Sequence, residues 1–185
     1  MGERAEQRRL IILRHAKADR PGDTADVDRP LTQRGHADTG AAGAWLAARG
    51  YLPDLVICSP SKRTRQTWHG IAVALSEPAL QRGRRAEQSA DPGALVRYEP
   101  ALYEEGVGAI LALVRAIEPE YGNALVIGHN PTVSLLSAML DPKANRDSDG
   151  LRTCGLAVHR AETAWREWGP GAAPLVASHT ARMAE

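Results

Sequence analysis

The sequence predicts an α/β protein: a three-layer sandwich in which helices flank a mostly parallel, mixed central sheet. Three apolar runs have the length of buried strands, namely Leu10–Leu13, Leu55–Cys58 and Ala124–Ile127. Segments with a helical period separate these runs, and this alternation is typical of a sheet covered on both faces. Near the C-terminus, Cys154–His159 and Ala164–Trp168 have the pattern of an antiparallel strand pair, which is why we expect a mixed sheet.

The first predicted helix spans about 33–49, because Thr32 can cap its start and Gly50 can end it. Its apolar residues share one face at helical spacing. They are Ala37, Ala41, Ala44, Trp45 and Ala48. Ser59 is expected to cap the next helix, with Pro60 at the first helical position, where the missing N–H of proline costs nothing.

The remaining segments follow the same alternation. Leu95–Tyr98 is a short predicted strand, and 107–117 and Thr132–Leu140 have the helical period. The connection 19–30 is a loop rich in Asp, Gly and Pro, and the arginine-rich segment 81–93 is polar along its length. We expect the segment 81–93 to be a surface connection.

Length and composition indicate one globular domain spanning 1–185, with 1–9 and about 177–185 as possible disordered tails. A net charge of +1 gives no global footprint for nucleic acid. No apolar stretch approaches the roughly 20 residues of a membrane span, and the N-terminus has no secretory core. We therefore expect a cytoplasmic protein without nucleic-acid or membrane partners. Cys58 and Cys154 lack zinc-site spacing and are expected to be buried free thiols.

Each of the three apolar runs ends in residues suited to binding an anion. Arg14 and His15 follow the first run, a Ser-Pro-x-x-Arg segment ending in Arg63 follows the second, and His129 follows the third. In an open α/β sheet, ligands bind at the carboxyl ends of the parallel strands. The sequence therefore predicts that two imidazoles and two guanidiniums meet at one edge.

That set of groups suits phosphoryl transfer. Arg14 and Arg63 would bind the phosphoryl oxygens through bidentate, charge-assisted hydrogen bonds. Neutral His15 would attack phosphorus and form a phosphohistidine, with His129 as a further donor. Such a cage supplies positioning and electrostatic stabilisation, so we expect no metal and no cofactor.

The chain resembles the histidine phosphatase (phosphoglycerate mutase-like) superfamily across roughly residues 10–160. The motifs that carry the resemblance are Arg14-His15-Ala16, Ser59-Pro60-x-x-Arg63-x-x-Gln66-Thr67 and Gly128-His129-Asn130-Pro131. Two further segments look like the SixA-type phosphohistidine phosphatases, namely Asp28-Arg29-Pro30-Leu31-Thr32 and Glu99-Pro100-Ala101-Leu102-Tyr103-Glu104. The resemblance implies a phosphoglycerate mutase-like fold, and His15 as the group that takes the phosphoryl, in a pocket lined by Arg14, Arg63 and His129.

The general acid is not fixed by the sequence. Many members of the superfamily place a glutamate between the second and third motifs, and Glu104 and Glu105 are the candidates here. Pro21 stands where many members have an asparagine. Because an imidazole leaves more readily than an alkoxide, a weakly placed acid favours phosphohistidine as substrate. Lys17 is a candidate at the rim of the pocket.

We therefore expect a metal-independent phosphohydrolase that dephosphorylates phosphohistidine on a signalling or phosphotransfer protein. One alternative is a phosphatase of a small phosphomonoester, such as a sugar phosphate or nucleotide. Another is a non-catalytic module that binds a phospho-ligand. A thiol phosphatase is excluded, because Thr64 stands six residues after Cys58, where that chemistry needs an arginine.

Overall fold

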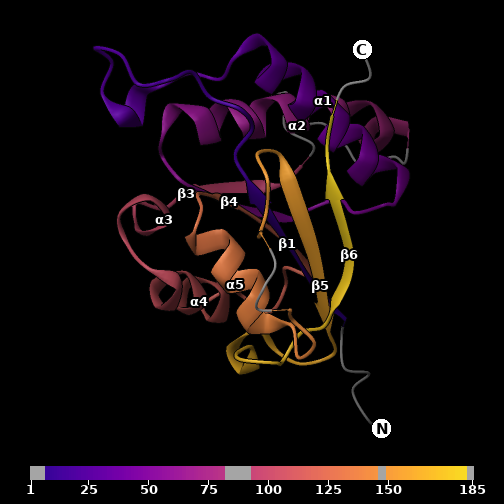
Figure 1. Cartoon of the computed structure of the whole chain (residues 1–185). Helices are drawn as coiled ribbons and strands as arrows, with labels where there is room; N and C mark the ends of the chain where they lie inside the picture. Colours follow the sequence, from indigo (N-terminus) through magenta and orange to yellow (C-terminus); the bar gives the residue numbers. More distant parts are fainter. Residues whose placement is uncertain (1–6, 82–92, 146–148, 183–185) are drawn as a thin grey trace, which may run out of the picture.

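The computed structural model describes residues 7–81, 93–145 and 149–182. Within these ranges six strands form one sheet in the order β3-β2-β4-β1-β5-β6 (Figure 1). The strands are β1 (Arg8–Arg14), β2 (Leu55–Cys58), β3 (Leu95–Tyr98), β4 (Asn123–Gly128), β5 (Gly155–Ala161) and β6 (Leu175–Thr180). Strands β3, β2, β4 and β1 are parallel, whereas β5 is antiparallel to both of its neighbours. The predicted mixed, mostly parallel sheet is confirmed.

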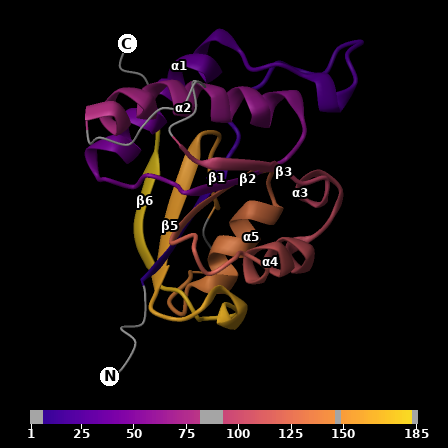
Figure 2. The same cartoon turned by 180° about the vertical axis from the view of Figure 1, so that it is seen from behind.

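Helices cover both faces of the sheet (Figures 1 and 2). On one face, α1 (Gln33–Ala48) packs against α2 (Lys62–Gln81). The other face carries α3 (Ala101–Glu104), α4 (Val107–Arg115) and α5 (Thr132–Leu140). Two short 3-10 helices, η1 (Asp26–Asp28) and η2 (Trp165–Glu167), lie in the connections before α1 and before β6. The three predicted layers are present.

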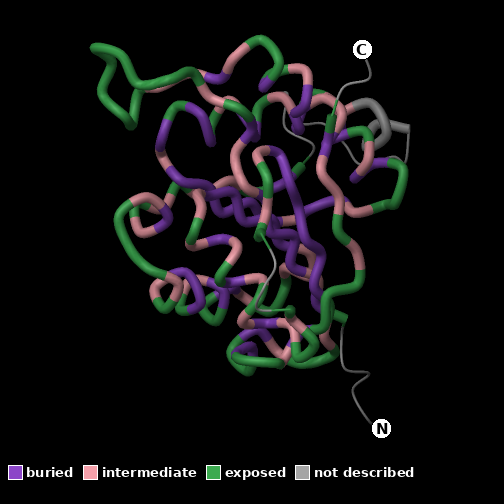
Figure 3. The backbone as a smooth tube through the Cα atoms, viewed as in Figure 1, coloured by how far each residue is buried: buried purple, intermediate pink, exposed green. Residues whose placement is uncertain are grey.

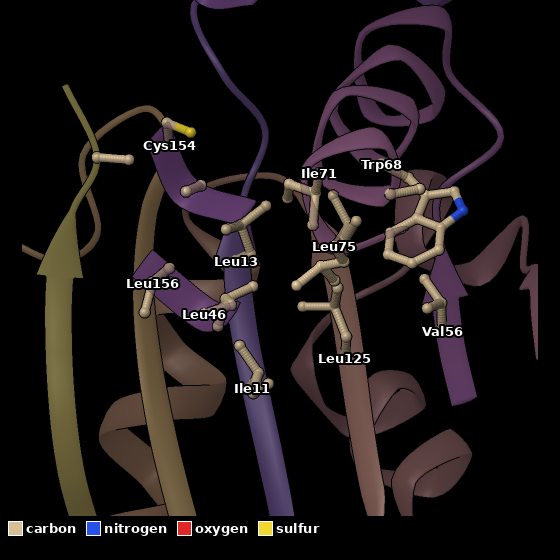
Figure 4. Packing of buried hydrophobic residues seen from close by; sticks show 14 of the residues in the cluster. Ile11, Leu13, Leu46, Val56, Trp68, Ile71, Leu75, Leu125, Cys154 and Leu156 are labelled. Atoms are coloured by element: carbon tan, nitrogen blue, oxygen red, sulfur yellow. The ribbon is translucent and has the colours of Figure 1, made fainter. Parts of the chain in front are cut away.

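The first strand shows why the predicted runs are apolar without alternation. Ile11 and Leu13 lie in the apolar cluster under α1 and α2, where they join Leu46 (Figure 4). Leu10 and Ile12 lie in the opposite cluster, under α4 and α5. A strand buried on both faces has no solvent side on which polar residues would recur. Figure 3 shows this burial through the centre of the sheet.

The expected ends of α1 are confirmed. The side chain of Thr32 accepts a hydrogen bond from Gly35 N at 2.9 Å, which caps the first turn. Gly50 follows the helix with a φ of 67°. That conformation is open to glycine without steric cost, and it turns the chain towards β2.

The expected apolar face of α1 was wrong. Ala44 and Ala48 are exposed and Trp45 is only half-buried. The buried face instead includes Gly43, where an added Cβ would lie 2.8 Å from the carbonyl oxygen of Ile71 on α2. Small residues let the two helices approach closely, so small size decides this contact more than hydrophobicity does.

The expected start of α2 was also wrong. The helix begins at Lys62, two residues after Pro60, and Arg65 N donates to Ser61 O at 3.1 Å in the first turn. Ser59 makes only a long capping contact, since its Oγ accepts from Ser61 N at 3.5 Å and lies closer, at 2.8 Å, to His129 Nε2. Thr64 Oγ1 instead donates to Ser59 O at 2.7 Å and closes the turn.

The C-terminal strand pair needs correction as well. Residues 164–168 do not form a strand, because η2 turns Trp165 and Trp168 into the core beside α4. The partner of β5 is β6, which pairs along Leu175–Thr180. This strand occupies the start of the segment 177–185 that was expected to be disordered. At the other end, β1 already begins at Arg8, inside the expected tail 1–9.

Some expectations fall outside the described residues. They concern 1–6, most of the arginine-rich segment 81–93, and 183–185. In the described part of the chain, no helix combines the length and apolar character needed to cross a membrane. The cysteines behave as expected. Both are free and buried, and burial raises the pKa of the Cys58 and Cys154 thiols to about 12.

Candidate active site

The three motifs meet at the carboxyl ends of β1, β2 and β4. His15 N, just beyond β1, donates to Gly128 O at 3.1 Å, and Ser59 N, just beyond β2, donates to Ile127 O at 3.0 Å. Both bonds continue the parallel pairing with β4 past the ends of the strands. His15 and His129 are therefore brought together, with ring centroids 5.2 Å apart and ring planes tilted by 55°.

The tautomer of His15 follows from its own backbone. Its Nδ1 lies 2.7 Å from the carbonyl oxygen of Ala16. A carbonyl can only accept, so Nδ1 carries the proton and Nε2 carries the lone pair. Burial, reinforced by the charges of Arg63 and Arg14 and opposed by the bond to Ala16, lowers the pKa of His15 to about 4. His15 is thus a neutral imidazole at pH 7.

The opposite tautomer is assigned to His129. Its Nδ1 lies 3.3 Å from Arg63 Nη2, which can only donate, so Nδ1 accepts. Nε2 therefore carries the proton and donates to Ser59 Oγ at 2.8 Å. Burial, with the neighbouring His15 and Arg63, lowers the pKa of His129 to about 3. Both imidazoles are neutral at pH 7.

The two arginines reach the site from different elements. Arg63 is buried on the first turn of α2, and Arg14 ends β1, where its Nη1 donates to Leu151 O at 3.1 Å. The Nε atoms of both are buried and have no acceptor among the described residues. Each guanidinium therefore keeps one N–H donor that has no partner among the described residues.

Two residues that the sequence reasoning missed complete the site. Asp26 of η1 accepts from Arg63 twice, at its backbone carbonyl (2.6 Å) and at Oδ2 (3.0 Å). Tyr103 of α3 donates its hydroxyl to Asp26 Oδ2 at 2.8 Å and lies edge-on to His129, with ring centroids 5.5 Å apart. The only sequence signal for Tyr103 was its place beside Glu104, and Asp26 had only its closeness to the Asp28–Thr32 segment.

The residues that were expected at the rim of the pocket and as the general acid are exposed and do not join the four central side chains. Glu104 and Glu105 are exposed at the end of α3, and no hydrogen bond of the described site involves their side chains. Lys17 is exposed too, and only its backbone carbonyl takes part in a described contact, accepting from Thr32. The structure thus brings together Arg14, His15, Arg63 and His129, but not Lys17, Glu104 or Glu105.

A cavity of about 1170 Å³ adjoins the site between α5, the loop after it, and β5 and β6. Asn130 and Leu151 line it, and they also border the site, because Leu151 O accepts from both Arg14 Nη1 and Asn130 Nδ2. The cavity lies next to the proposed phosphoryl pocket and does not include His15 or Arg63.

Comparison with known proteins agrees with this geometry. Residues 10–92 match the model of the histidine phosphatase superfamily (branch 1). An uncharacterized protein of Mycobacterium tuberculosis is 34% identical over 177 residues, which cover 92% of this chain and 100% of the relative.

Solved structures share the whole fold. A candidate phosphohistidine phosphatase SixA from Nakamurella multipartitia has a TM-score of 0.74 at 32% identity, with 97% of this chain and 99% of that chain covered. A second such SixA, from Agrobacterium tumefaciens, has a TM-score of 0.73 at 27% identity, with 93% and 97% covered. On this evidence the chain belongs to the histidine phosphatase superfamily and is a phosphatase of the SixA type.

Proposed function

We propose that this phosphatase removes the phosphoryl group from phosphohistidine carried by a signalling or phosphotransfer protein. The observation that carries the proposal is the state of His15. Its Nδ1 proton is held by Ala16 O at 2.7 Å, which leaves the lone pair on Nε2 of a neutral ring. A nucleophile in that state needs no base to activate it.

In the first step, His15 Nε2 attacks phosphorus as the bond to the leaving nitrogen breaks. The reacting form of the substrate is the cationic ring, phosphorylated at one nitrogen and protonated at the other. The leaving nitrogen takes the electron pair of the P–N bond, and the substrate histidine departs as neutral imidazole. Arg14 and Arg63 neutralise the phosphoryl oxygens throughout. His129 supports Arg63 through its Nδ1, and it donates to a phosphoryl oxygen by exchanging the Nε2–H bond that it makes to Ser59 Oγ.

In the second step, water attacks the phosphoryl group on His15. The Nε2–P bond breaks, its electron pair returns to Nε2, and a proton of the water passes to a phosphate oxygen. Nδ1 keeps its proton throughout, because Ala16 O accepts a hydrogen bond from it, so His15 also leaves as neutral imidazole. Inorganic phosphate is released and the starting tautomer is restored.

The surroundings of the site favour a leaving group that needs no general acid. Asp26 is the carboxyl group in contact with Arg63, and hydrogen bonds from Arg29, Tyr103 and Arg63 hold its pKa well below the usual range. It is therefore ionised and has no proton to give. The Asp26 carboxylate also raises the pKa of Tyr103, which keeps its proton. An alkoxide leaving group would need a proton donor, whereas an imidazole already protonated at its other nitrogen does not.

The names of two relatives support the same substrate class. The structures from Nakamurella and Agrobacterium, at 32% and 27% identity, are both described as candidate phosphohistidine phosphatases.

Turnover by the purified full chain tests the proposal. The substrates are a histidine-phosphorylated phosphotransfer protein, a sugar phosphate and a nucleotide monophosphate. We expect phosphate release from the first, with kcat/KM at least about a hundredfold above the others. Faster turnover of the sugar phosphate or nucleotide would replace the proposal with a small-molecule phosphatase. Saturable phosphate binding with no turnover of any substrate would indicate a binding module.

A further inference from the structure

A carboxylate lies at a place where the proposed chemistry alone does not require one. Asp26 Oδ2 is 3.0 Å from Arg63 Nη2, and the Asp26 side chain is 52% exposed whereas that of Arg63 is 7% exposed. The carboxylate therefore lies on the solvent side of a guanidinium assigned to the phosphoryl group. Like charges repel, so an ionised group here disfavours a bound phosphoryl dianion.

The carboxylate is fixed rather than incidental. Arg29 Nη1 donates to Asp26 Oδ1 at 2.8 Å, and Arg29 is itself anchored by Asp19 O, which accepts from its Nε (2.9 Å) and Nη2 (2.6 Å). The connection is closed at its base by the bridge between Ala18 and Leu31. A group held in this way is available for recognition without a further ordering cost.

The carboxylate can still accept another hydrogen bond. Of the roughly four acceptor positions on a carboxylate, the described residues use three: Arg29 on Oδ1, and Arg63 and Tyr103 on Oδ2. One position on Oδ1 remains, and the side chain as a whole is half-exposed. Residues 19–28 are all exposed, and the connection projects from the body of the molecule (Figures 1 and 3). A histidine on the surface of another protein can therefore reach it.

We propose that Asp26 is a specificity residue that accepts the N–H of the phosphohistidine ring at the nitrogen that is not phosphorylated. The inference rests on the proposed function and names how its substrate is selected. The contact keeps the proton on that nitrogen, so the electron pair of the breaking P–N bond returns to a ring that departs neutral. A phosphomonoester has no such N–H and meets only the repulsion of the carboxylate.

A purely structural role makes a different prediction. If Asp26 served only to hold Arg63, its loss would weaken phosphoryl binding for every substrate in equal measure. If Asp26 recognises the leaving group, its loss changes the ratio of the kcat/KM values for two substrates with different leaving groups. The comparison substrate should therefore need no general acid either, and p-nitrophenyl phosphate meets that condition because nitrophenolate is a good leaving group.

The test compares Asp26→Asn with Asp28→Asn on a histidine-phosphorylated peptide and on p-nitrophenyl phosphate. Asp28 belongs to the same 3-10 helix and is exposed, so its variant removes the same charge as a matched control. We expect Asp26→Asn to lower kcat/KM for the phosphohistidine peptide about tenfold. Activity on p-nitrophenyl phosphate should rise, because the carboxylate no longer repels the phosphoryl dianion, so the ratio of the two kcat/KM values should fall by more than about tenfold. Asp28→Asn should alter neither, and Asp26→Glu should recover part of the loss.

Two measurements guard the interpretation. Inhibition by inorganic phosphate reports on Arg63, and its inhibition constant should be unchanged or lower in Asp26→Asn. Thermal unfolding checks that the variant is folded, and Asp26→Ser serves in its place if it is not. If Asp26→Asn lowered kcat/KM equally for both substrates, or raised it equally for both, the proposed role of Asp26 in selectivity would be wrong. Absence of phosphohistidine turnover in the unaltered protein would instead overturn the proposed function.

Discussion

His15 is held in place by the residue that follows it in the chain. Its Nδ1 donates to Ala16 O, and Ala16 N donates to Thr67 Oγ1 at 3.1 Å. Thr67 Oγ1 in turn donates to Arg63 O at 2.7 Å. One buried hydroxyl thus links the backbone that fixes the proposed nucleophile to the backbone of Arg63, which makes Thr67 a positioning residue.

Replacing Thr67 with valine removes that link without changing the volume of the side chain much. The buried Ala16 N–H loses its acceptor, which should lower the free energy of unfolding by about 1–3 kcal/mol. We expect kcat to fall about tenfold, because the peptide that fixes the His15 ring is released. Denaturant unfolding and steady-state kinetics check the two effects. Thr67→Ser, which keeps the hydroxyl, should retain both stability and kcat, and loss of kcat in that variant would contradict the role.

The protonation of His15 gives a prediction in pH. Because its pKa is lowered to about 4, the folded protein binds no proton at this ring between pH 7 and about pH 5. An NMR titration of the imidazole resonances, with His15→Ala for assignment, should show His15 neutral until the pH approaches 4. A midpoint near the ordinary value of about 6.5 would contradict the neutral nucleophile.

Some residues of the site could be predicted from the sequence and others could not. Arg14, His15, Arg63 and His129 were identifiable because each follows or opens an element with a clear apolar pattern. Asp26 and Tyr103 were not, since one lies in an aperiodic connection and the other in a helix of four residues. Such short elements have no period that would show which side chain turns inward. The sequence therefore indicated Glu104 as a possible general acid, whereas in the structure the neighbouring Tyr103 contacts Asp26 and His129.

The strands and helices differ in how well they can be predicted from their sequences. Strands β1, β2 and β4 were predicted to within two residues at each end, because burial on both faces makes them continuously apolar. Strand β6 was missed, because it lies at the sheet edge and none of its residues is fully buried. The buried face of α1 was predicted wrongly, because its close approach to α2 depends on glycines such as Gly43, which carry no hydrophobic signal.

Two glycines of α1 test that contact as a matched pair. A Cβ at Gly43 would lie 2.6 Å from Ala74 Cβ on α2, whereas one at Gly40 would meet nothing within 4 Å. Gly43→Ala should therefore lower the free energy of unfolding by about 1–3 kcal/mol. Gly40→Ala should raise it by up to about 1 kcal/mol, through helix propensity alone. Both values come from urea unfolding, and equal effects of the two changes would contradict the close packing.

For the whole molecule, the topology explains why distant motifs converge. The sheet order places β4 between β2 and β1, so the parallel strands that carry the three motifs are direct neighbours. The antiparallel part adds a second constraint, here called the clamp. Cys154 N, just before β5, donates to the carbonyl oxygens of Arg14 (3.2 Å) and His15 (3.1 Å), which fixes the backbone of both residues. The convergence at the parallel edge could be predicted from sequence, but the clamp could not, since no side-chain pattern encodes it.

The convergence has one chemical consequence that can be observed directly. Mixing the full chain with a ³²P-labelled phosphohistidine peptide and quenching in alkali should trap a phosphoenzyme. Peptide mapping should then place the label on His15, and the label should be acid-labile, as a phosphoramidate is. His15→Ala should carry no label and show no turnover. A label on another residue, or full turnover by His15→Ala, would contradict the account.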